Sequence, residues 1–376
     1  MAAFRLVLTA LAVALVVATA LPLSRSSEWW VRMFDFPRMQ IAVAAVVVLV
    51  LFGVVGVWMG EPTAWEWALL VALAVATVYQ ATQMVPYTPL HGVQTVRADG
   101  ALADPDRRFR LVVTNVLMEN REGDRWLGVI RDADPDVVAA VETDEWWAET
   151  AAALDETHPH HVALPQDDTY GMLVYSKLPL DSVEVLHRVE PEVPSLRLTV
   201  RLRSGEPVTL VLVHPRPPRP DIQQDSDLRD AELVLAGRDV AQLDGPVVVA
   251  GDLNDVAWSH TTRLFQELSG LLDPRVGRGT FSTFHAEHWW LRYPLDHVFH
   301  SEHFALRELR RLDPVGSDHF PILIELELDP SVAPLQATPD AEADDLEEGA
   351  EKVEDAQEMK ATESEAERQE RVEEDR

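Results

Sequence analysis

The stretch at residues 246–255, PVVVAGDLND, constrains the fold of this chain more strongly than any other segment. An unbroken apolar run ends abruptly at Gly251, Asp252 and Asn254, which is the pattern of a strand buried on both faces that presents polar side chains at its carboxyl end. Because side chains alternate along a strand, we expect Asp252 and Asn254 on one face, with Gly251 letting the backbone pass close to a ligand. The alternative is a strand that runs into an ordinary turn, since Asp and Asn are common turn residues.

Three long apolar runs occupy the N-terminal part of the chain, at about 4–23, 41–58 and 64–84. Each is near the length of roughly 20 residues that crosses a bilayer, and Glu66, near the start of the third run, is the only charge in their interiors. Tryptophans cluster at the ends of the runs, where amphipathic rings sit at the level of lipid headgroups. We therefore predict three transmembrane helices in residues 1–85 of an integral membrane protein; the alternative is a buried helical hairpin in a soluble protein.

The sequence contains conflicting signals about which side of the membrane holds the rest of the chain. An amino terminus left in the cytoplasm places the segment after the third helix outside it, and so does cleavage of the first run as a signal peptide. Against this, the first loop holds Arg25, Arg32 and Arg38, and an excess of arginine in a short loop favours the cytoplasmic side. We expect an extracytoplasmic domain on a bacterial plasma membrane.

The overall composition excludes several classes of protein. With 63 acidic against 32 basic residues the formal net charge is -31, so the chain lacks the broad basic surface of a general nucleic-acid binder. It contains no cysteine, which excludes disulfides, thiolate metal sites and thiol nucleophiles. Any polyanion must therefore be held locally, by a metal and a few arginines.

Local composition marks the domain boundaries. Residues 86–106 are rich in Pro, Gly, Asp and Thr, which is typical of a linker. Residues 329–376 contain about 18 acidic and about 5 basic residues and no aromatic residue, so this tail cannot bury enough apolar surface to fold alone. We predict a soluble domain at residues 107–328, followed by an acidic tail at 329–376 that is disordered or loosely helical.

Apolar runs typical of strands dominate the soluble domain, with helical patterns between them. Besides the strand that ends at Asp252, we expect strands at 110–116, 136–141, 171–176, 180–187, 196–202, 208–214, 293–300, 305–312 and 320–328. Helices are expected at 124–132, in the segment after Glu142, at 223–243 and at 259–268. Because strands dominate and no repeat is present, two sheets packed together and covered by helices are the expected architecture.

Polar side chains recur at the ends of these apolar strands. They are Asn115, Glu142, His214, Asp252 with Asn254, Asp296, and Asp318 with His319. A single polar strand end is usually a turn, but this many within one domain indicate a common site.

Phosphoester hydrolysis needs residues of these types. A hard divalent cation is held by carboxylate and amide oxygens, a base activates water, and donors stabilise the charge that develops on the non-bridging oxygens. We assign Glu142 to the metal, Asp252 to the orientation and deprotonation of water, and Asn254 to a hydrogen bond with the phosphoryl group. Asp296 is expected to fix the imidazole of His319 and raise its basicity.

In this order and spacing, the motifs resemble the endonuclease/exonuclease/phosphatase superfamily, which includes type I deoxyribonuclease. The matching elements are Thr114-Asn115, Val141-Glu142, Val213-His214, Gly251-Asp252-Leu253-Asn254, Leu295-Asp296-His297 and Gly316-Ser317-Asp318-His319. The resemblance covers about residues 107–328 and implies a four-layer α/β sandwich with Mg²⁺-dependent phosphoester hydrolysis, Mn²⁺ being the alternative ion. With helices at the front, the layout resembles the bacterial membrane-anchored branch of the superfamily.

The resemblance also implies roles for individual residues. Asn115 and Glu142 would lie at the metal, with Asp318 near it. His214 and Asn254 would contact the phosphate, and Asp252 would act on the nucleophile. Asp296 would pair with His319.

Two further groups of residues have less specific patterns. Arg216 and Arg219, on a proline-rich loop after His214, are equally compatible with a clamp on a substrate phosphate and with a solvated rim. Four histidines suggest a transition-metal cluster, but without a cysteine or carboxylate pattern they are expected in loops and on the surface. These histidines are His285, His288, His300 and His303.

Three functional hypotheses follow. The first is a membrane-anchored phosphodiesterase acting on nucleic acid, although the acidic domain offers little counterion release to drive polyanion binding. The second is cleavage of a lipid headgroup phosphodiester of the sphingomyelin type, which the membrane helices would keep at high local concentration. The third, from another class, is a catalytically silent membrane scaffold that binds partners.

Overall fold

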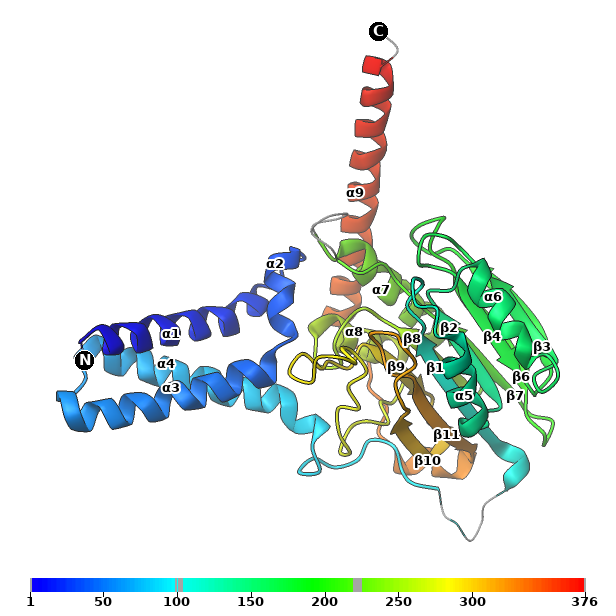
Figure 1. Cartoon of the computed structure of the whole chain (residues 1–376), viewed down its shortest axis with the longest axis horizontal. Coiled ribbons are helices and arrows are strands. Elements are labelled where there is room, and N and C mark those ends of the chain that lie inside the picture. The colour runs from blue at the N-terminus through cyan, green and yellow to red at the C-terminus, as the bar shows by residue number, and fades with distance from the viewer. Residues whose placement is uncertain (1, 99, 101–103, 219–224, 375–376) are drawn as a thin grey trace.

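The computed structural model describes residues 2–98, 100, 104–218 and 225–374. A bundle of three long helices lies beside a larger α/β domain, and a long C-terminal helix projects from that domain (Figure 1).

The bundle consists of α1 (Ala2–Ala20), α3 (Arg38–Met59) and α4 (Ala64–Met84). All three helices are long and apolar enough to cross a membrane, as the sequence predicts. They pack through a small apolar core, while most of their other apolar side chains are exposed, which is the pattern of helices that face lipid. The charge predicted inside the third run belongs to the cap of α4, where Glu66 accepts the Thr63 N–H and pairs with Arg5 at 2.7 Å.

The α/β domain contains two sheets, with strand orders β10-β11-β1-β2-β4-β3 and β5-β6-β7-β8-β9. The strands of the larger sheet are β1 (Arg108–Asn115), β2 (Val137–Val141), β3 (His160–Leu164), β4 (Met172–Ser176), β10 (Phe304–Arg311) and β11 (Ile322–Leu328). The strands of the smaller sheet are β5 (Leu180–Leu186), β6 (Ser195–Arg201), β7 (Pro207–Leu212), β8 (Val247–Asp252) and β9 (Asp296–His300). Both sheets are mixed, because β1 with β2 and β7 with β8 are parallel and the other neighbours are antiparallel.

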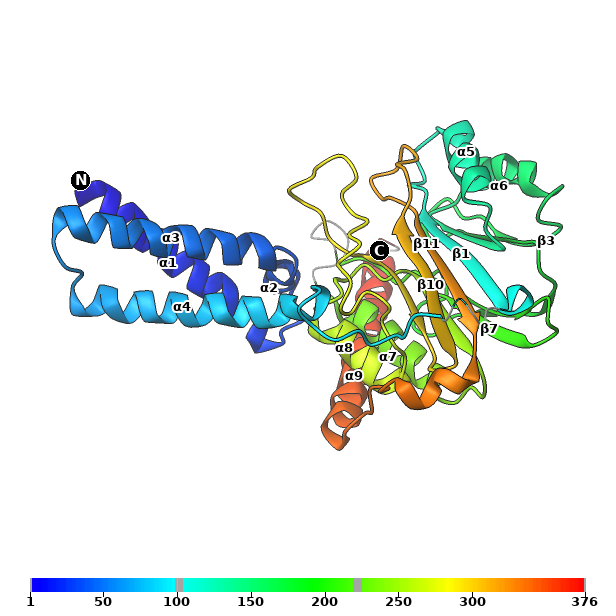
Figure 2. The ribbon, with the colours of Figure 1, turned by 90° about the horizontal axis from the view of Figure 1, so that it is seen from below.

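The two sheets face each other across the main apolar core, and helices cover their outer faces (Figure 2). The larger sheet is covered by α5 (Gly123–Ala133) and α6 (Glu145–Ala151), mainly through Trp126 and Trp147. The smaller sheet is covered by α7 (Asp227–Ala241) and α8 (His260–Ser269), which bury Leu233 and Phe265. The resulting order of helices, sheet, sheet and helices confirms the expected four-layer α/β sandwich.

Most strands and helices lie within a few residues of their expected positions. The exception is β3, an edge strand that the sequence analysis missed, because its half-exposed residues His160–Leu164 have no apolar run. The helix expected at 223–243 begins at Asp227, and residues 223 and 224 lie outside the described part of the chain.

The acidic tail is helical over most of its described length. It forms the short 3-10 helix η6 (Pro330–Leu335) and the long helix α9 (Ala343–Glu374). Ala356 is buried against Leu228 and Ala231 of α7, and Val353 packs beside it. Val353, Ala356 and Met359, spaced three residues apart, pack with the residues of α7, so α9 is stabilised by docking on the domain rather than by a core of its own.

The segment between α1 and α3 also docks on the α/β domain. It contains α2 (Trp29–Arg32) and the 3-10 helix η2 (Met33–Asp35). The indole of Trp258 donates a hydrogen bond to the carbonyl of Asp35 at 2.7 Å, and Phe36 packs edge-on against Tyr293. This juxtamembrane segment, residues 29–37, is therefore fixed against the domain.

The described part of the linker, expected at 86–106, is likewise held on the domain. Its Ala98 N–H donates to the Leu306 carbonyl at the edge strand β10, and the Tyr87 hydroxyl donates to the Ala257 carbonyl. The linker therefore runs along the domain surface instead of acting as a free tether.

Candidate active site

The polar strand ends meet at one edge of the sandwich, where the two sheets face each other. The larger sheet contributes Asn115 at the end of β1 and Glu142 directly after β2. The smaller sheet contributes Asp252 and Asp296, which are directly opposite each other in the antiparallel pair β8–β9. The sandwich thus brings together side chains that are separated by up to two hundred residues in the chain.

Gly251 has a role different from the expected one. Its backbone has φ +142, and a Cβ there would lie 1.9 Å from the carbonyl oxygen of Val213. Glycine is therefore required by the close approach of the neighbouring β7 backbone, not by a ligand.

Asp252 is the buried centre of the site. Its Oδ1 accepts the backbone N–H of Asn254 at 2.9 Å, and its Oδ2 accepts the amide of Asn115 at 3.0 Å. The same Oδ2 lies 3.6 Å from Nε2 of His319. Contacts from both sheets thus fix the carboxylate, with one oxygen facing the imidazole.

His319 and Asp296 form the expected dyad. His319 Nδ1 donates to Asp296 Oδ2 at 2.7 Å, and the backbone N–H of Asp296 donates to Thr283 Oγ1. Burial disfavours the charged imidazole, but Asp296 and Asp252 outweigh it and raise the pKa of His319 to about 10. The imidazole is therefore positively charged at neutral pH, with Nε2–H as a donor toward the site.

Glu142 and Asn115 are joined by a hydrogen bond of 2.7 Å from Asn115 Nδ2 to Glu142 Oε1. Asn115 Oδ1 accepts the N–H of Leu117, which leaves the amide nitrogen facing both carboxylates. As placed, Asn115 orients Glu142 and Asp252 and presents no oxygen toward a metal between them. The ligand role that the resemblance implies for Asn115 stays a prediction.

The donor set fits a hard divalent cation. Potential ligand atoms of Glu142, His214 and Asp252 lie within 4.8 Å of one another, and so do those of Asp252, Asp296 and His319. Burial and the charge of Asp252 raise the pKa of Glu142, although His214 and the hydrogen bond from Asn115 act in the opposite direction. The carboxylate oxygens of Glu142 and Asp252 are ligands of the type that Mg²⁺ and Mn²⁺ prefer. Asp318 lines the same cavity but belongs to neither group of ligand atoms.

Asn254 lies beside Asp252 in a left-handed backbone conformation, with φ +51. Its side-chain amide donates to the carbonyl of Pro215 at 3.0 Å, and its own carbonyl accepts the buried guanidinium of Arg229 at 2.9 Å. Asn254 also lines the cavity. The bond to Pro215 uses one of the two N–H groups of this amide and leaves the second as a donor for a phosphoryl oxygen.

His214 and Arg216 lie behind the site. The buried His214 has Nε2 4.0 Å from Glu142 Oε1, and its Nδ1 has no hydrogen-bond partner among the described residues. Arg216 makes two contacts with the carboxylate of Glu190, at 3.0 and 2.7 Å. The guanidinium is thus engaged within the chain, so the structure favours a role in holding this loop over a phosphate clamp. Arg219 lies outside the described residues.

A cavity of about 750 Å³ opens above these residues. Glu142, Asp252, Asn254, Asp318 and His319 line one side. The opposite side is lined by Trp29, Arg32, Met33, Phe36 and Pro37 of the juxtamembrane segment. The contribution of this segment to the cavity was not predicted from the sequence. The spacing of Arg32, Asp35 and Arg38, three charges in a short loop next to apolar runs, is the sequence feature that could have indicated it.

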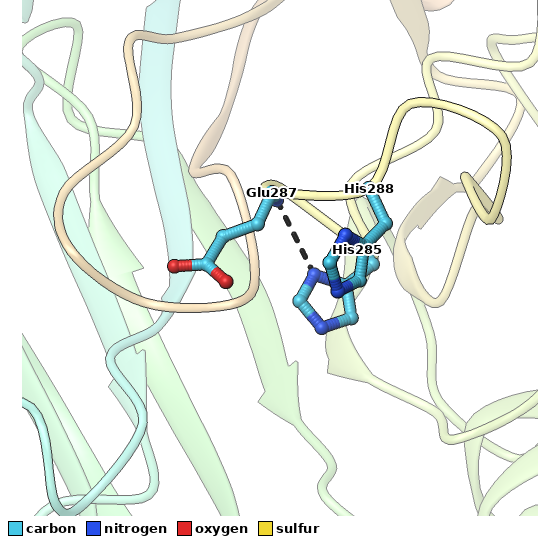
Figure 3. A group of neighbouring side chains, drawn as sticks. All are labelled: His285, Glu287 and His288. Atoms are coloured by element: carbon cyan, nitrogen blue, oxygen red, sulfur yellow. Dashed lines mark hydrogen bonds between the residues drawn. The ribbon is translucent and has the colours of Figure 1, made fainter.

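Of the four histidines expected in loops and on the surface, His303 lies in the turn before β10, where its Nδ1 contacts Ser301 Oγ at 3.0 Å. His300 is fully buried on β9, where Nε2 contacts the Thr95 hydroxyl at 2.9 Å, so its expected surface position is wrong. His285 and His288 lie on the loop before β9 with ring centres 4.5 Å apart. Figure 3 shows the two rings side by side, with the Glu287 N–H donating to His285 and the Glu287 carboxylate turned outward. Potential ligand atoms of these three residues still lie within 4.8 Å.

Comparison with known proteins agrees with this architecture. Solved structures with a similar fold include Danio rerio TDP2 complexed with single-strand DNA product, which is 16% identical, with a TM-score of 0.50 over 58% of this chain and 99% of that chain. The human Nocturnin catalytic domain with bound sulfate anion is 16% identical, with a TM-score of 0.49 over 64% of this chain and 98% of that chain. An endonuclease/exonuclease/phosphatase from Beutenbergia cavernae is 20% identical, with a TM-score of 0.47 over 59% of this chain and 72% of that chain.

A search of curated protein sequences found no match. The sequence profile of the Endonuclease/Exonuclease/phosphatase family matches residues 112–319, which include the polar strand-end residues of the site but not the juxtamembrane segment that lines the cavity. This match covers more than half of the chain. The chain therefore belongs to the endonuclease/exonuclease/phosphatase family and is a hydrolase acting on phosphoester bonds.

Proposed function

We propose that this protein is a membrane-anchored, Mg²⁺-dependent phosphodiesterase in which Asp252 activates the attacking water. The main support for this proposal is that Asp252 is buried between Asn115 and His319 at the base of the cavity. Asp252 is held by donors on both of its oxygens, yet it faces the cavity through which a substrate would enter.

The proposed roles follow from the protonation states. Asp252 accepts the proton of the water that attacks phosphorus. His319, charged at neutral pH, directs Nε2–H toward the negative charge that develops on the phosphoryl oxygens or the leaving group. Asp296 fixes the His319 ring through Nδ1. The amide of Asn254 is held by the Pro215 carbonyl through one N–H and donates its second N–H to a non-bridging oxygen.

Glu142 would hold the metal, with Asn115 beside it and Asp318 supplying a further oxygen ligand from the same cavity. When bound, Mg²⁺ or Mn²⁺ would neutralise charge on the phosphoryl group. Asn115 holds the two carboxylates in place, and His214 supports Glu142 from behind.

Two substrate classes remain in competition. The fold resembles that of a protein solved with a DNA product, which supports a nucleic-acid phosphodiester. A lipid headgroup phosphodiester is favoured by a different observation, since Trp29, Met33 and Phe36 of the segment between two apolar helices form part of the cavity wall. A catalytically silent scaffold is the third alternative.

The α/β domain is proposed to lie on the extracytoplasmic side, together with the loop that carries Arg32 and Arg38. Arg38 pairs with Asp35 at 2.5 Å, and Arg32 lies 3.6 Å from Asp230; all four side chains are buried. The contact between Arg32 and Asp230 joins this loop to the domain, and three membrane spans likewise put the loop and the domain on the same side.

The experiment is turnover by the full-length protein in lipid nanodiscs, because the juxtamembrane segment forms part of the cavity. Bis-para-nitrophenyl phosphate, plasmid DNA and sphingomyelin are tested with Mg²⁺, with Mn²⁺ and with EDTA. We expect metal-dependent cleavage that Asp252→Asn reduces by roughly 10²–10⁴-fold, while Asp132→Asn, an exposed carboxylate on α5, has no effect. The preferred substrate separates nuclease from lipid hydrolase. A folded protein that binds Mg²⁺ but turns over none of the three substrates supports the scaffold.

A further inference from the structure

A second cavity, of about 830 Å³, lies between the start of α3 and the loop before β9. Its helical wall is formed by Met39, Gln40, Val43 and Ala44. Its other wall is formed by Thr280, Phe281, Ser282, Trp289, Trp290, Arg292 and Arg311. None of these residues lines the catalytic cavity, so the two cavities are distinct. We call this second cavity the α3 groove.

One end of the α3 groove is cationic. The guanidinium groups of Arg292 and Arg311 contact the same ring, with their centres 5.1 and 4.2 Å from the centroid of Phe320. Arg311 donates to the Ser282 carbonyl at 2.9 Å, and Arg292 donates to the Ala286 carbonyl at 3.3 Å.

Neither arginine has a carboxylate within 4.0 Å in the described part of the chain. Nε of Arg292 is buried and has no hydrogen-bond partner there. Burial and the nearby Arg292 also lower the pKa of Arg311, as expected for two cations without a counter-ion. In a chain of net charge -31, an uncompensated pair of arginines favours an anionic ligand.

The other end of the α3 groove is apolar and belongs to the predicted membrane region. Met39 and Val43 are 56% and 60% exposed, and both lie at the start of a helix that can span a membrane. Across the groove, Trp289 and Trp290 are 74% and 53% exposed, which is unusual for large rings unless they face lipid or a partner.

A hydrogen bond fixes the two walls relative to each other. The side-chain amide of Gln40 donates to the carbonyl of Trp290 at 2.7 Å. This hydrogen bond holds the first turns of α3 beside the exposed tryptophans, so the two walls of the groove have a defined relative position.

We propose that the α3 groove binds one anionic phospholipid of the host bilayer. Its phosphate would lie at Arg292 and Arg311, its glycerol region beside Trp289 and Trp290, and an acyl chain along Met39 and Val43. Charge complementarity selects an anionic headgroup, and continuity with α3 selects a lipid over a soluble phosphate. The inference rests on the membrane anchoring proposed above but not on the proposed catalysis.

The test is lipid binding by the full-length protein, released from detergent and measured by native mass spectrometry. Phosphatidylglycerol is titrated against phosphatidylcholine of the same chain length. We expect tighter binding of phosphatidylglycerol, and loss of affinity by about tenfold or more in Arg292→Gln/Arg311→Gln. Arg292→Lys/Arg311→Lys keeps the charge and is expected to retain most of the preference.

The charge-matched control is Arg25→Gln/Arg131→Gln, which removes two exposed arginines elsewhere and is expected to leave binding unchanged. A second measurement, quenching of tryptophan fluorescence by brominated phosphatidylglycerol, is expected to weaken in Trp289→Phe/Trp290→Phe. Equal affinity for the two lipids overturns the proposal, as does unchanged affinity in a folded double glutamine variant. Turnover of bis-para-nitrophenyl phosphate, recorded on the same samples, separates a failure of this proposal from a failure of the proposed catalysis.

Discussion

The guanidinium of Arg32 lies 3.6 Å from the carboxylate of Asp230, and both side chains are buried. Arg32 belongs to the juxtamembrane segment and Asp230 to α7 of the α/β domain. Lys352 of α9 and Arg229 contact the same carboxylate at 3.0 and 2.7 Å. Burial raises the pKa of Asp230, but these three cations outweigh it and lower the pKa below its usual range. One carboxylate thus joins the membrane region, the domain and the tail.

Asp230→Asn is expected to destabilise the full-length protein by about 3–5 kcal/mol, because it removes the buried carboxylate that Arg32, Arg229 and Lys352 share. The measurement is unfolding by denaturant in a fixed detergent. Asp239→Asn is the matched control on the same helix, since Asp239 is half-exposed and pairs only with Arg188 among the described residues. Its expected cost is below about 1 kcal/mol. Equal losses in the two variants would contradict a special role for Asp230.

Asp296→Asn is expected to reduce kcat by roughly 10²–10⁴-fold, since it removes the acceptor that fixes His319 Nδ1 and the charge that keeps the ring protonated. The change is nearly isosteric, so the thermal midpoint should fall far less than the activity. Asp313→Asn, which alters an exposed carboxylate in the segment before His319, serves as the control. A kcat within twofold of the wild type in the Asp296 variant would exclude the dyad from the rate-limiting step.

Asn254 allows the backbone and side-chain contributions to be separated. Glycine adopts φ +51 without strain, whereas alanine does not. Both Asn254→Gly and Asn254→Ala remove the amide donor, so both are expected to lose turnover, but only the alanine variant should lose an additional ~1 kcal/mol of stability. Turnover and unfolding are measured on the same preparations. Full activity in the glycine variant would mean that the amide does not contact the phosphoryl group.

The layers of the fold were predictable because the strands are buried on one or both faces. Continuous apolar runs such as Val247 to Ala250 are stable as strands only when both of their faces are buried between packed layers. Polar residues directly after such a run must therefore lie at the edge of the sheet. The same logic located Glu142, Asp252 and Asp296. It failed for β3, whose side chains alternate at an exposed edge and leave no apolar run.

Features that depend on contacts between distant segments were not predictable. The orientation of the Asn115 amide is set by the N–H of Leu117, and the need for Gly251 is set by the backbone of Val213. Docking of the tail depends on the groove on α7 that receives Ala356. The composition of the tail shows that it cannot form a core by itself. It does not show that the α/β domain offers a surface on which the tail can bury its apolar residues.

The buried His300 is expected to make the stability of the α/β domain depend on pH. Burial lowers its pKa to about 4, from 6.5 in the unfolded chain, although the Ser301 carbonyl accepts from its Nδ1. The unfolded chain therefore takes up a proton first as the pH falls, so this contribution to stability is complete above pH ~6.5 and is lost progressively toward pH ~4. The loss amounts to at most about 3 kcal/mol. Unfolding by denaturant at pH 7.5 and pH 5.0 measures it.

His300→Gln supplies the control for this pH dependence, because glutamine can keep a hydrogen bond to the Thr95 hydroxyl but does not titrate. The variant is expected to be less stable than the wild type at pH 7.5, and the difference should shrink at pH 5.0. The exposed His161 gives the matched comparison, since His161→Gln removes a titratable ring that is accessible to solvent in both states. If the His300 variant loses as much stability between the two pH values as the wild type does, another buried group, such as His297, is responsible.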